Sequence, residues 1–118
     1  MKLTVRKSEF FLADLGIQFR WYETEASADV AWRYLLAVDR AVEELAGQPD
    51  LGRKRHFKHP ELQGLRSYRA ARPFDRHLIF CRHDEASLDL MRVMHGARDL
   101  PRRLRQLPET REDESTPK

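Results

Sequence analysis

Between Ser27 and Pro49, an apolar side chain recurs at every third or fourth position. The members of this stripe are Ala31, Leu35, Val38, Val42 and Leu45, with Tyr34 beside them. The spacing matches the turn of an α-helix, so it predicts an amphipathic helix that begins after an N-cap at Ser27 and runs to about Ala46. A stable zipper between chains takes about three to four heptads. Because the stripe is shorter than that, we interpret it as a face that packs against the chain's own core.

A second amphipathic helix precedes this one. Ser8 suits its N-cap, and four apolar side chains follow at spacings of four, four and three residues: Phe11, Leu15, Phe19 and Tyr22. Only the segment ETEAS (residues 23–27) separates the two helices, which predicts a helical hairpin. In front of the hairpin, residues 2–6 (KLTVR) alternate between polar and apolar and indicate a short strand.

Three strand-like runs follow the hairpin, at residues 65–71, 77–83 and 88–95. The segments between them are short, which predicts an antiparallel meander. The middle run is apolar on both faces, as expected for a central strand. Residues 48–64, which contain two prolines and two glycines, are predicted to form a loop.

The C-terminal part reads as a short basic helix over residues 97–107, with Pro101 tolerated in its first turn. The residues beyond it are almost all polar. We therefore expect one α+β domain over residues 1–107 and a disordered polar tail over residues 108–118.

The composition limits the classes of protein to consider. The 118 residues are 41% hydrophobic and 35% charged, which is typical of a soluble globular domain. We expect no membrane span and no secretory signal, because no apolar run is long enough for either. The single cysteine, Cys81, lies in an apolar run, and a buried free thiol suits a reducing cytoplasm. We therefore expect a cytoplasmic protein.

Positive charge is concentrated in the middle of the chain. Residues 53–77 hold eight Lys/Arg and two Asp/Glu, whereas residues 1–52 hold six Lys/Arg and nine Asp/Glu. The formal net charge is only +3, but residues 53–77 form a basic block and residues 1–52 form an acidic half. This asymmetry favours an anionic partner, either a nucleic acid or an acidic protein surface.

The order of the predicted elements, together with short motifs at matching places, resembles the RelE/ParE superfamily of toxins from bacterial type II toxin–antitoxin modules. The resemblance extends from Val5 to Leu107. Its motifs are Asp14-Leu15, Trp21-Tyr22, Leu45 through Pro49, Gly52, Gly64-Leu65-Arg66, LIFCR (residues 78–82) and RVMHGARDL (residues 92–100). It implies an N-terminal strand, an amphipathic helical hairpin packed on a mostly antiparallel sheet, and a short C-terminal helix.

The resemblance also implies a function. It implies a cytoplasmic toxin of the plasmid-stabilization type, neutralised by a cognate antitoxin that is small and acidic and has a DNA-binding N-terminal part. ParE-like members poison DNA gyrase and are not nucleases, whereas RelE-like members cleave messenger RNA on the ribosome. We expect no cofactor in either case.

If the chain is a RelE-like endoribonuclease, the candidate catalytic residues are His95, Arg66, Arg82 and Arg92. Metal-independent cleavage needs a base for the 2′-hydroxyl, an acid for the leaving oxygen and cations for the phosphate. Histidine titrates near neutral pH, and arginines on strands offer donors to a phosphate. His95 stands near the end of the last strand, where many RNA-cleaving members place a histidine or a tyrosine.

If the chain is ParE-like, His95 has a structural or partner-binding role. Arg92, His95 and Arg98 would then form a cationic edge that contacts the antitoxin or gyrase. The other expected partner-binding residues are Arg53, Lys54 and Arg55 in the loop and Phe11 and Leu15 on the first helix. Between residues 66 and 76 every basic residue is arginine, without the lysines of the best-known nuclease branch. We therefore favour the ParE-like, non-enzymatic interpretation and keep the ribonuclease as the alternative.

The motif HFKH places His56 and His59 at a spacing found in metal sites. The surrounding loop is rich in Lys and Arg and offers neither a cysteine nor a paired carboxylate. A zinc ion needs further ligands of those types, so no metal site is expected.

Overall fold

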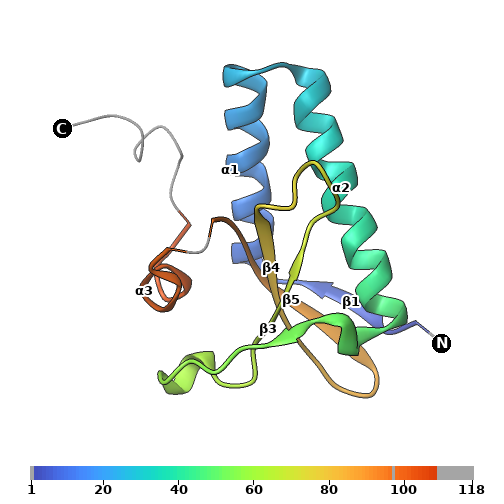
Figure 1. Ribbon diagram of the computed structural model, residues 1–118, viewed down its shortest axis with the longest axis vertical. Coiled ribbons are helices and arrows are strands. Elements are labelled where there is room, and N and C mark those ends of the chain that lie inside the picture. Colours follow the sequence, from blue (N-terminus) through green and yellow to red (C-terminus); the bar gives the residue numbers. More distant parts are fainter. Residues whose placement is uncertain (1, 97, 109–118) are drawn as a thin grey trace.

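The computed structural model describes residues 2–96 and 98–108. Its elements follow in the order β1 (Thr4–Lys7), α1 (Glu9–Glu25), α2 (Ala28–Gly47), β2 (Arg53–Lys54), β3 (Arg66–Arg69), β4 (His77–His83), β5 (Ser87–His95) and α3 (Leu100–Leu104), with short 3-10 helices at Pro49–Leu51 and Pro60–Leu62. The strands form one five-stranded sheet in the order β1-β5-β4-β3-β2. β1 is parallel to β5, and the other pairs are antiparallel. The predicted α+β fold, with its hairpin and meander, is confirmed (Figure 1).

Both helices of the hairpin begin at the predicted serines. The Ser8 hydroxyl accepts a hydrogen bond from the Phe11 N–H at 3.0 Å, and the Ser27 hydroxyl accepts one from the Val30 N–H at 3.1 Å. Each bond satisfies an N–H group that the first helical turn leaves without a partner. The predicted stripe of α2 faces the core, and its members Ala31, Tyr34, Val38, Val42 and Leu45 are buried.

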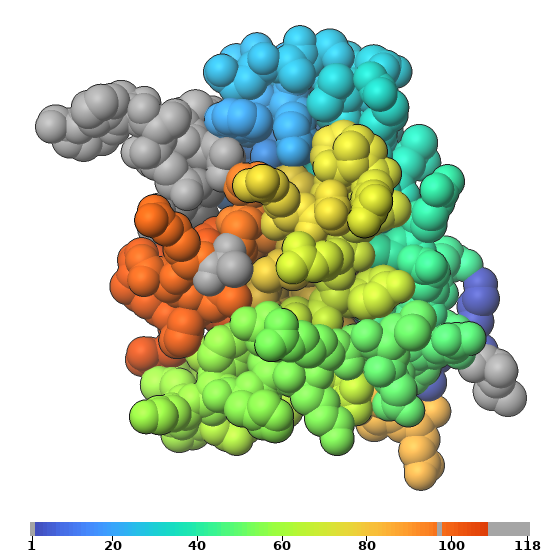
Figure 2. All heavy atoms as spheres, viewed as in Figure 1, coloured from blue at the N-terminus to red at the C-terminus, as the bar shows by residue number. Residues whose placement is uncertain are grey.

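The sheet separates two apolar clusters. On the helix face, which the hairpin covers, the buried side chains include Phe11, Tyr34, Val38, Leu45, Ile79, Cys81, Leu88 and Leu90. On the opposite side, which we call the loop face, they are Leu62, Leu65, Leu78, Phe80, Met94, Leu100 and Leu104. In Figure 2, α3 (orange) and residues 56–64 (light green) lie side by side over this face. β4 is therefore apolar on both faces, as predicted for a central strand.

Two details differ from the prediction. The segment 48–64 is not only a loop, because Arg53 and Lys54 pair with Ser67 and Arg66 as the edge strand β2. Two charged residues carry no apolar alternation, so the sequence gives no sign of this strand. The C-terminal helix spans Leu100–Leu104 instead of residues 97–107. Ala97 and the predicted tail from residue 109 onward lie outside the described residues.

Candidate functional site

A buried ion pair fixes the C-terminal half of β5 to α1. Arg92 donates from Nε to Oδ2 of Asp14 at 2.8 Å and from Nη2 to Oδ1 at 3.0 Å. The two side chains are only 6% and 9% exposed. The N–H of Val93 donates to the same carboxylate at 3.1 Å. Burial raises the pKa of Asp14, although Arg92 and the Val93 N–H act in the opposite direction.

The same guanidinium also holds the C-terminal segment. Its Nη1 donates to the carbonyl oxygens of Gln106 at 2.6 Å, Leu104 at 3.3 Å and Arg103 at 3.4 Å. Phe80 pairs with Arg92, whereas Cys81 pairs with Leu90, so β5 contains a bulge at this point. A bulge redirects the side chains beside it. The expectation that Arg92 lies on an exposed cationic edge is therefore wrong, because its guanidinium points inward.

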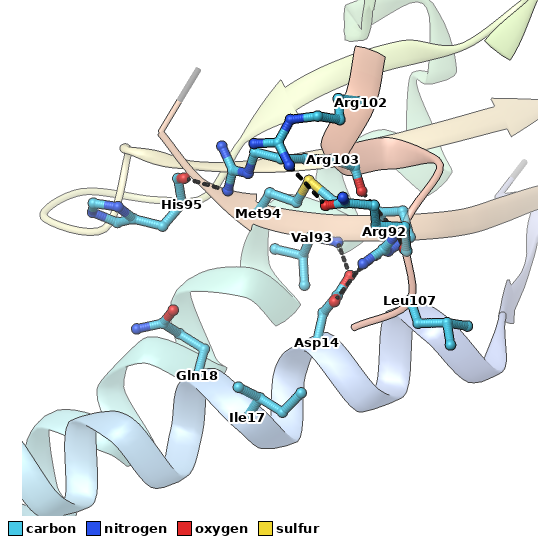
Figure 3. A pocket seen from close by; sticks show the side chains of 11 residues that line it. Asp14, Ile17, Gln18, Arg92, Val93, Met94, His95, Arg102, Arg103 and Leu107 are labelled. Carbon is cyan, nitrogen blue, oxygen red and sulfur yellow. Dashed lines mark hydrogen bonds and ion pairs between the residues drawn. The ribbon is translucent and has the colours of Figure 1, made fainter. Parts of the chain in front are cut away.

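Asp14 and Arg92 form one wall of a pocket between α1, the end of β5 and the C-terminal segment (Figure 3). We call it the C-terminal pocket. It has a volume of about 220 Å³, and Gln18, His95 and Arg103 also line it. Arg103 Nη2 donates to the carbonyl oxygen of His95 at 2.9 Å, which links the end of β5 to α3.

His95 lies beside a group of buried rings on the helix face. Its ring centroid is 4.9 Å from that of His77 in an edge-on arrangement. His77 is 1% exposed, and its Nε2 hydrogen-bonds to the Tyr22 hydroxyl at 2.8 Å. The predicted position of His95, at the end of the last strand, is confirmed. Its roles in catalysis or partner binding stay predictions.

The other two predicted catalytic arginines lie on opposite faces of the sheet. Arg66 pairs with Cys81 and shares its helix face, where Nη1 donates to the Gly52 carbonyl at 2.8 Å. Arg82 follows Cys81 along β4 and therefore points to the loop face, because successive side chains alternate. There it donates to the carbonyls of Gln63 at 2.9 Å and Glu61 at 2.7 Å. Of the four predicted catalytic residues, Arg92 and His95 line the C-terminal pocket, and Arg92 and Arg82 line a separate pocket on the loop face. Neither pocket contains more than two of the four.

The predicted basic partner surface is only partly exposed. Arg53, Lys54 and Arg98 are exposed. Arg55 is half-buried, since its Nη1 donates to the Ser67 hydroxyl at 3.1 Å and its guanidinium lies 5.5 Å from the Phe57 ring centroid. Burial lowers the pKa of Arg55, and the neighbouring charge of Arg53 acts in the same direction.

The apolar side chains that α1 offers to solvent are not the predicted ones. Phe11 is fully buried and Leu15 packs against the core of the helix face. Phe11 cannot contact a partner in this arrangement, because the stripe to which it belongs faces the sheet. The large exposed apolar residues of α1 are Phe10 and Leu12, which flank the stripe and are 41% and 51% exposed.

A second hollow, the basic groove, lies along β2 and β3. It has a volume of about 450 Å³, and three arginines line it: Arg53, Arg55 and Arg69. Arg69 donates from Nη1 to the Asp75 carbonyl at 2.8 Å. Several guanidinium groups around one hollow can bind phosphate. His95 is not part of its lining.

The sequence analysis missed four polar residues of the C-terminal pocket, Gln18, Arg102, Arg103 and Gln106. Gln18 is 6% exposed, and no described residue provides a hydrogen-bond partner for its Nε2. One signal for it was present, because Asp14, Gln18 and Tyr22 are four residues apart and so share one side of α1. No local signal distinguishes Arg103 from the other arginines of its segment, since its role depends on contacts across the fold.

The described part of the chain contains neither a metal site nor a membrane-spanning helix. Residues 2–96 and 98–108 contain no group of three or more His, Cys, Asp or Glu side chains arranged to hold a metal ion. The same residues form no helix with the length and apolar character needed to cross a membrane.

The fold is shared with two solved chains from toxin–antitoxin systems. The protein is similar to a chain of the chromosomal ParDE toxin–antitoxin system from P. aeruginosa, with a TM-score of 0.65 and 16% identity over 81% of this chain and 98% of that one. It is also similar to a chain of the toxin–antitoxin complex RelBE2 from Mycobacterium tuberculosis, with a TM-score of 0.54 and 19% identity over 80% of this chain and 99% of that one. No curated protein matched the chain in sequence.

The sequence itself defines the family more closely. Residues 5–100 match the family described as the ParE toxin of the type II toxin–antitoxin system parDE. The chain therefore belongs to the ParE toxin family.

Proposed function

We propose that this ParE-family toxin acts in the cytoplasm on DNA gyrase and cleaves no RNA. The observation that carries the proposal is the dispersal of the nuclease candidates. Arg92 is neutralised by Asp14, and Arg66 and Arg82 donate to backbone carbonyls on opposite faces of the sheet. Metal-free RNA cleavage needs a base, an acid and cations around one phosphate. The dispersal therefore supports a toxin that acts by binding.

A cognate antitoxin is the second part of the proposal. The similar chains from P. aeruginosa and M. tuberculosis come from toxin–antitoxin systems, which supports such a partner. The exposed side chains of Phe10 and Leu12 offer apolar contacts, and Arg53 and Lys54 offer positive charge. A small acidic protein complements both kinds of surface.

The target can be tested by expressing the wild-type chain and His95→Ala without antitoxin. We expect the wild type to induce the SOS response and gyrase-linked DNA breaks, and to leave messenger RNA on translating ribosomes intact. We expect the variant to differ from the wild type only through packing against His77 or through a partner contact. Purified gyrase in a supercoiling assay and primer extension on ribosomal complexes provide the two measurements.

A RelE-like endoribonuclease is the second candidate, because the basic groove gathers three arginines. It predicts ribosome-dependent cleavage by the wild type. Removal of an acid or base at His95 would then lower the cleavage rate by about a hundredfold or more. That result, with supercoiling unaffected, would overturn the gyrase proposal.

Charge reversal on the edge strand should separate partner binding from stability. We expect Arg53→Glu/Lys54→Glu to change the free energy of unfolding by less than about 0.5 kcal/mol, because both side chains are exposed. Arg55→Glu should cost about 1 kcal/mol or more, since it removes the bond to Ser67. Antitoxin affinity should fall in the double variant, and the difference from wild type should shrink at high salt. Urea unfolding and titration calorimetry at two salt concentrations measure both quantities.

A further inference from the structure

The C-terminal pocket contains a hydrogen-bond donor that the fold does not use. Gln18 lines the pocket, and its Nε2 has no acceptor among the described residues although the side chain is 6% exposed. Figure 3 shows this side chain extending from α1 toward the end of β5. A buried amide without an acceptor disfavours the folded state. An acceptor supplied by a ligand would remove that cost, so the position favours a ligand oxygen.

Arg103 adds positive charge to the same pocket. Its guanidinium donates to the carbonyl oxygens of Arg98 and His95, both at 2.9 Å. These acceptors are neutral, and two carboxylates of this region have other partners. Asp14 is paired with Arg92, and Asp99 with Arg102. Within residues 2–96 and 98–108, no carboxylate forms an ion pair with Arg103, so its charge is available to an anion.

Part of the remaining lining is apolar and suits a short apolar stem. Ile17, Met94 and Leu107 contribute to it. The volume of about 220 Å³ is well above the roughly 30 Å³ that one water molecule occupies in the liquid. A side chain with methylene groups behind a charged end therefore suits the pocket better than a single water molecule does.

We propose that the C-terminal pocket binds the carboxylate side chain of an Asp or Glu in an acidic peptide segment of a partner protein. One carboxylate oxygen accepts from Gln18 Nε2, and the positive charge of Arg103 compensates the negative charge. A nucleic-acid phosphate suits the pocket less well, because the free donor is buried and a backbone phosphate has no stem to reach it. The inference rests on the proposed function, in which the acidic partner is the antitoxin.

The substitution Gln18→Leu tests the donor, because it removes the amide and keeps helix propensity and similar volume. We expect the melting temperature of the free toxin to rise by about 3–5 °C, since an unsatisfied buried amide is lost. We also expect antitoxin affinity to fall about tenfold, since the partner's carboxylate loses a hydrogen bond. A purely structural role for Gln18 predicts no loss of affinity in a more stable protein.

The substitution Arg103→Gln tests the charge, with Arg105→Gln as its matched control. Arg105 lies in the same segment, but it is absent from the lining of the C-terminal pocket and faces Glu61 at 3.7 Å. We expect Arg103→Gln to lower antitoxin affinity about ten- to a hundredfold and to weaken its dependence on salt. Arg105→Gln should stay within about twofold of wild type. Circular dichroism checks that each variant is folded.

The outcomes distinguish this inference from the function on which it rests. If the wild-type chain binds no antitoxin, the proposed function fails and the inference fails with it. If the wild type binds tightly and both Gln18→Leu and Arg103→Gln bind within about twofold of it, the pocket receives no carboxylate and only the inference is overturned.

Discussion

Replacement of Arg92 by methionine should cost about 3–5 kcal/mol of unfolding free energy. The substitution leaves the carboxylate of Asp14 buried without its cation, and a single buried charge is far less favourable than a pair. It also removes the donor that three carbonyl oxygens of the C-terminal segment share. Urea unfolding followed by tryptophan fluorescence measures the loss.

A second substitution, at Asp14, should restore much of the stability that Arg92→Met removes. We expect Arg92→Met/Asp14→Leu to be clearly more stable than Arg92→Met, because the apolar pair leaves no uncompensated charge. The carbonyl oxygens stay without their donor, so recovery should be incomplete. A double variant as unstable as the single one would show that the loss comes from the C-terminal segment and not from the charge of Asp14.

The loss of unfolding free energy caused by Arg92→Met should also depend on pH. Burial already raises the pKa of Asp14, and removal of Arg92 takes away the main opposing influence. The folded variant therefore holds the proton more tightly than the unfolded chain does, and its stability rises as the pH falls through the folded-state pKa. The stability difference between wild type and variant should narrow from pH 7 toward pH 5. A difference that is independent of pH would contradict this account.

The second large effect concerns α3. Leu100 and Leu104 are 3% and 8% exposed and pack on the loop face against strand residues such as Phe80. Replacing either by alanine should cost about 2–5 kcal/mol, because the lost apolar contacts leave a cavity over the sheet. Thermal and urea unfolding of both single variants measure the cost.

The chain provides a matched control in Leu107, which belongs to the same segment and is 70% exposed. Leu107→Ala should change stability by less than about 0.5 kcal/mol. Equally small effects at all three leucines would mean that α3 does not belong to the same folding unit as the sheet. Large losses at Leu100 and Leu104 would support the expectation that α3 belongs to the same domain as the sheet.

Regular patterns made most of the fold predictable. A local signal is present in the stripe of α2 and in the three strand runs, because the apolar periods of helices and strands differ. The serine caps are a further local signal. No local sequence signal predicts the parallel pairing of β1 with β5 or the two-residue strand β2. Both depend on partners that are distant in the sequence.

The site was less predictable for a related reason. Arg92 reads as an ordinary sheet-face arginine, and only the bulge beside it and Asp14, 78 residues earlier, turn it inward. Gln18 could have been noticed as a polar residue in line with a buried face. The role of Arg103 could not have been predicted from the sequence, because its contact with His95 forms only after α3 packs beside the sheet.

The pairing of the first strand with the last has a consequence for synthesis. Thr4 pairs with Ser87, and Lys7 with Leu90, so β1 has no neighbour in the sheet until β5 exists. Arg92 then closes the structure by joining α1 to residues 103–106. Contacts this distant in sequence form late in folding. A nascent chain therefore stays incompletely folded until residues 103–106 have left the ribosome, so the ion pair of Arg92 is among the last parts of the structure that can form.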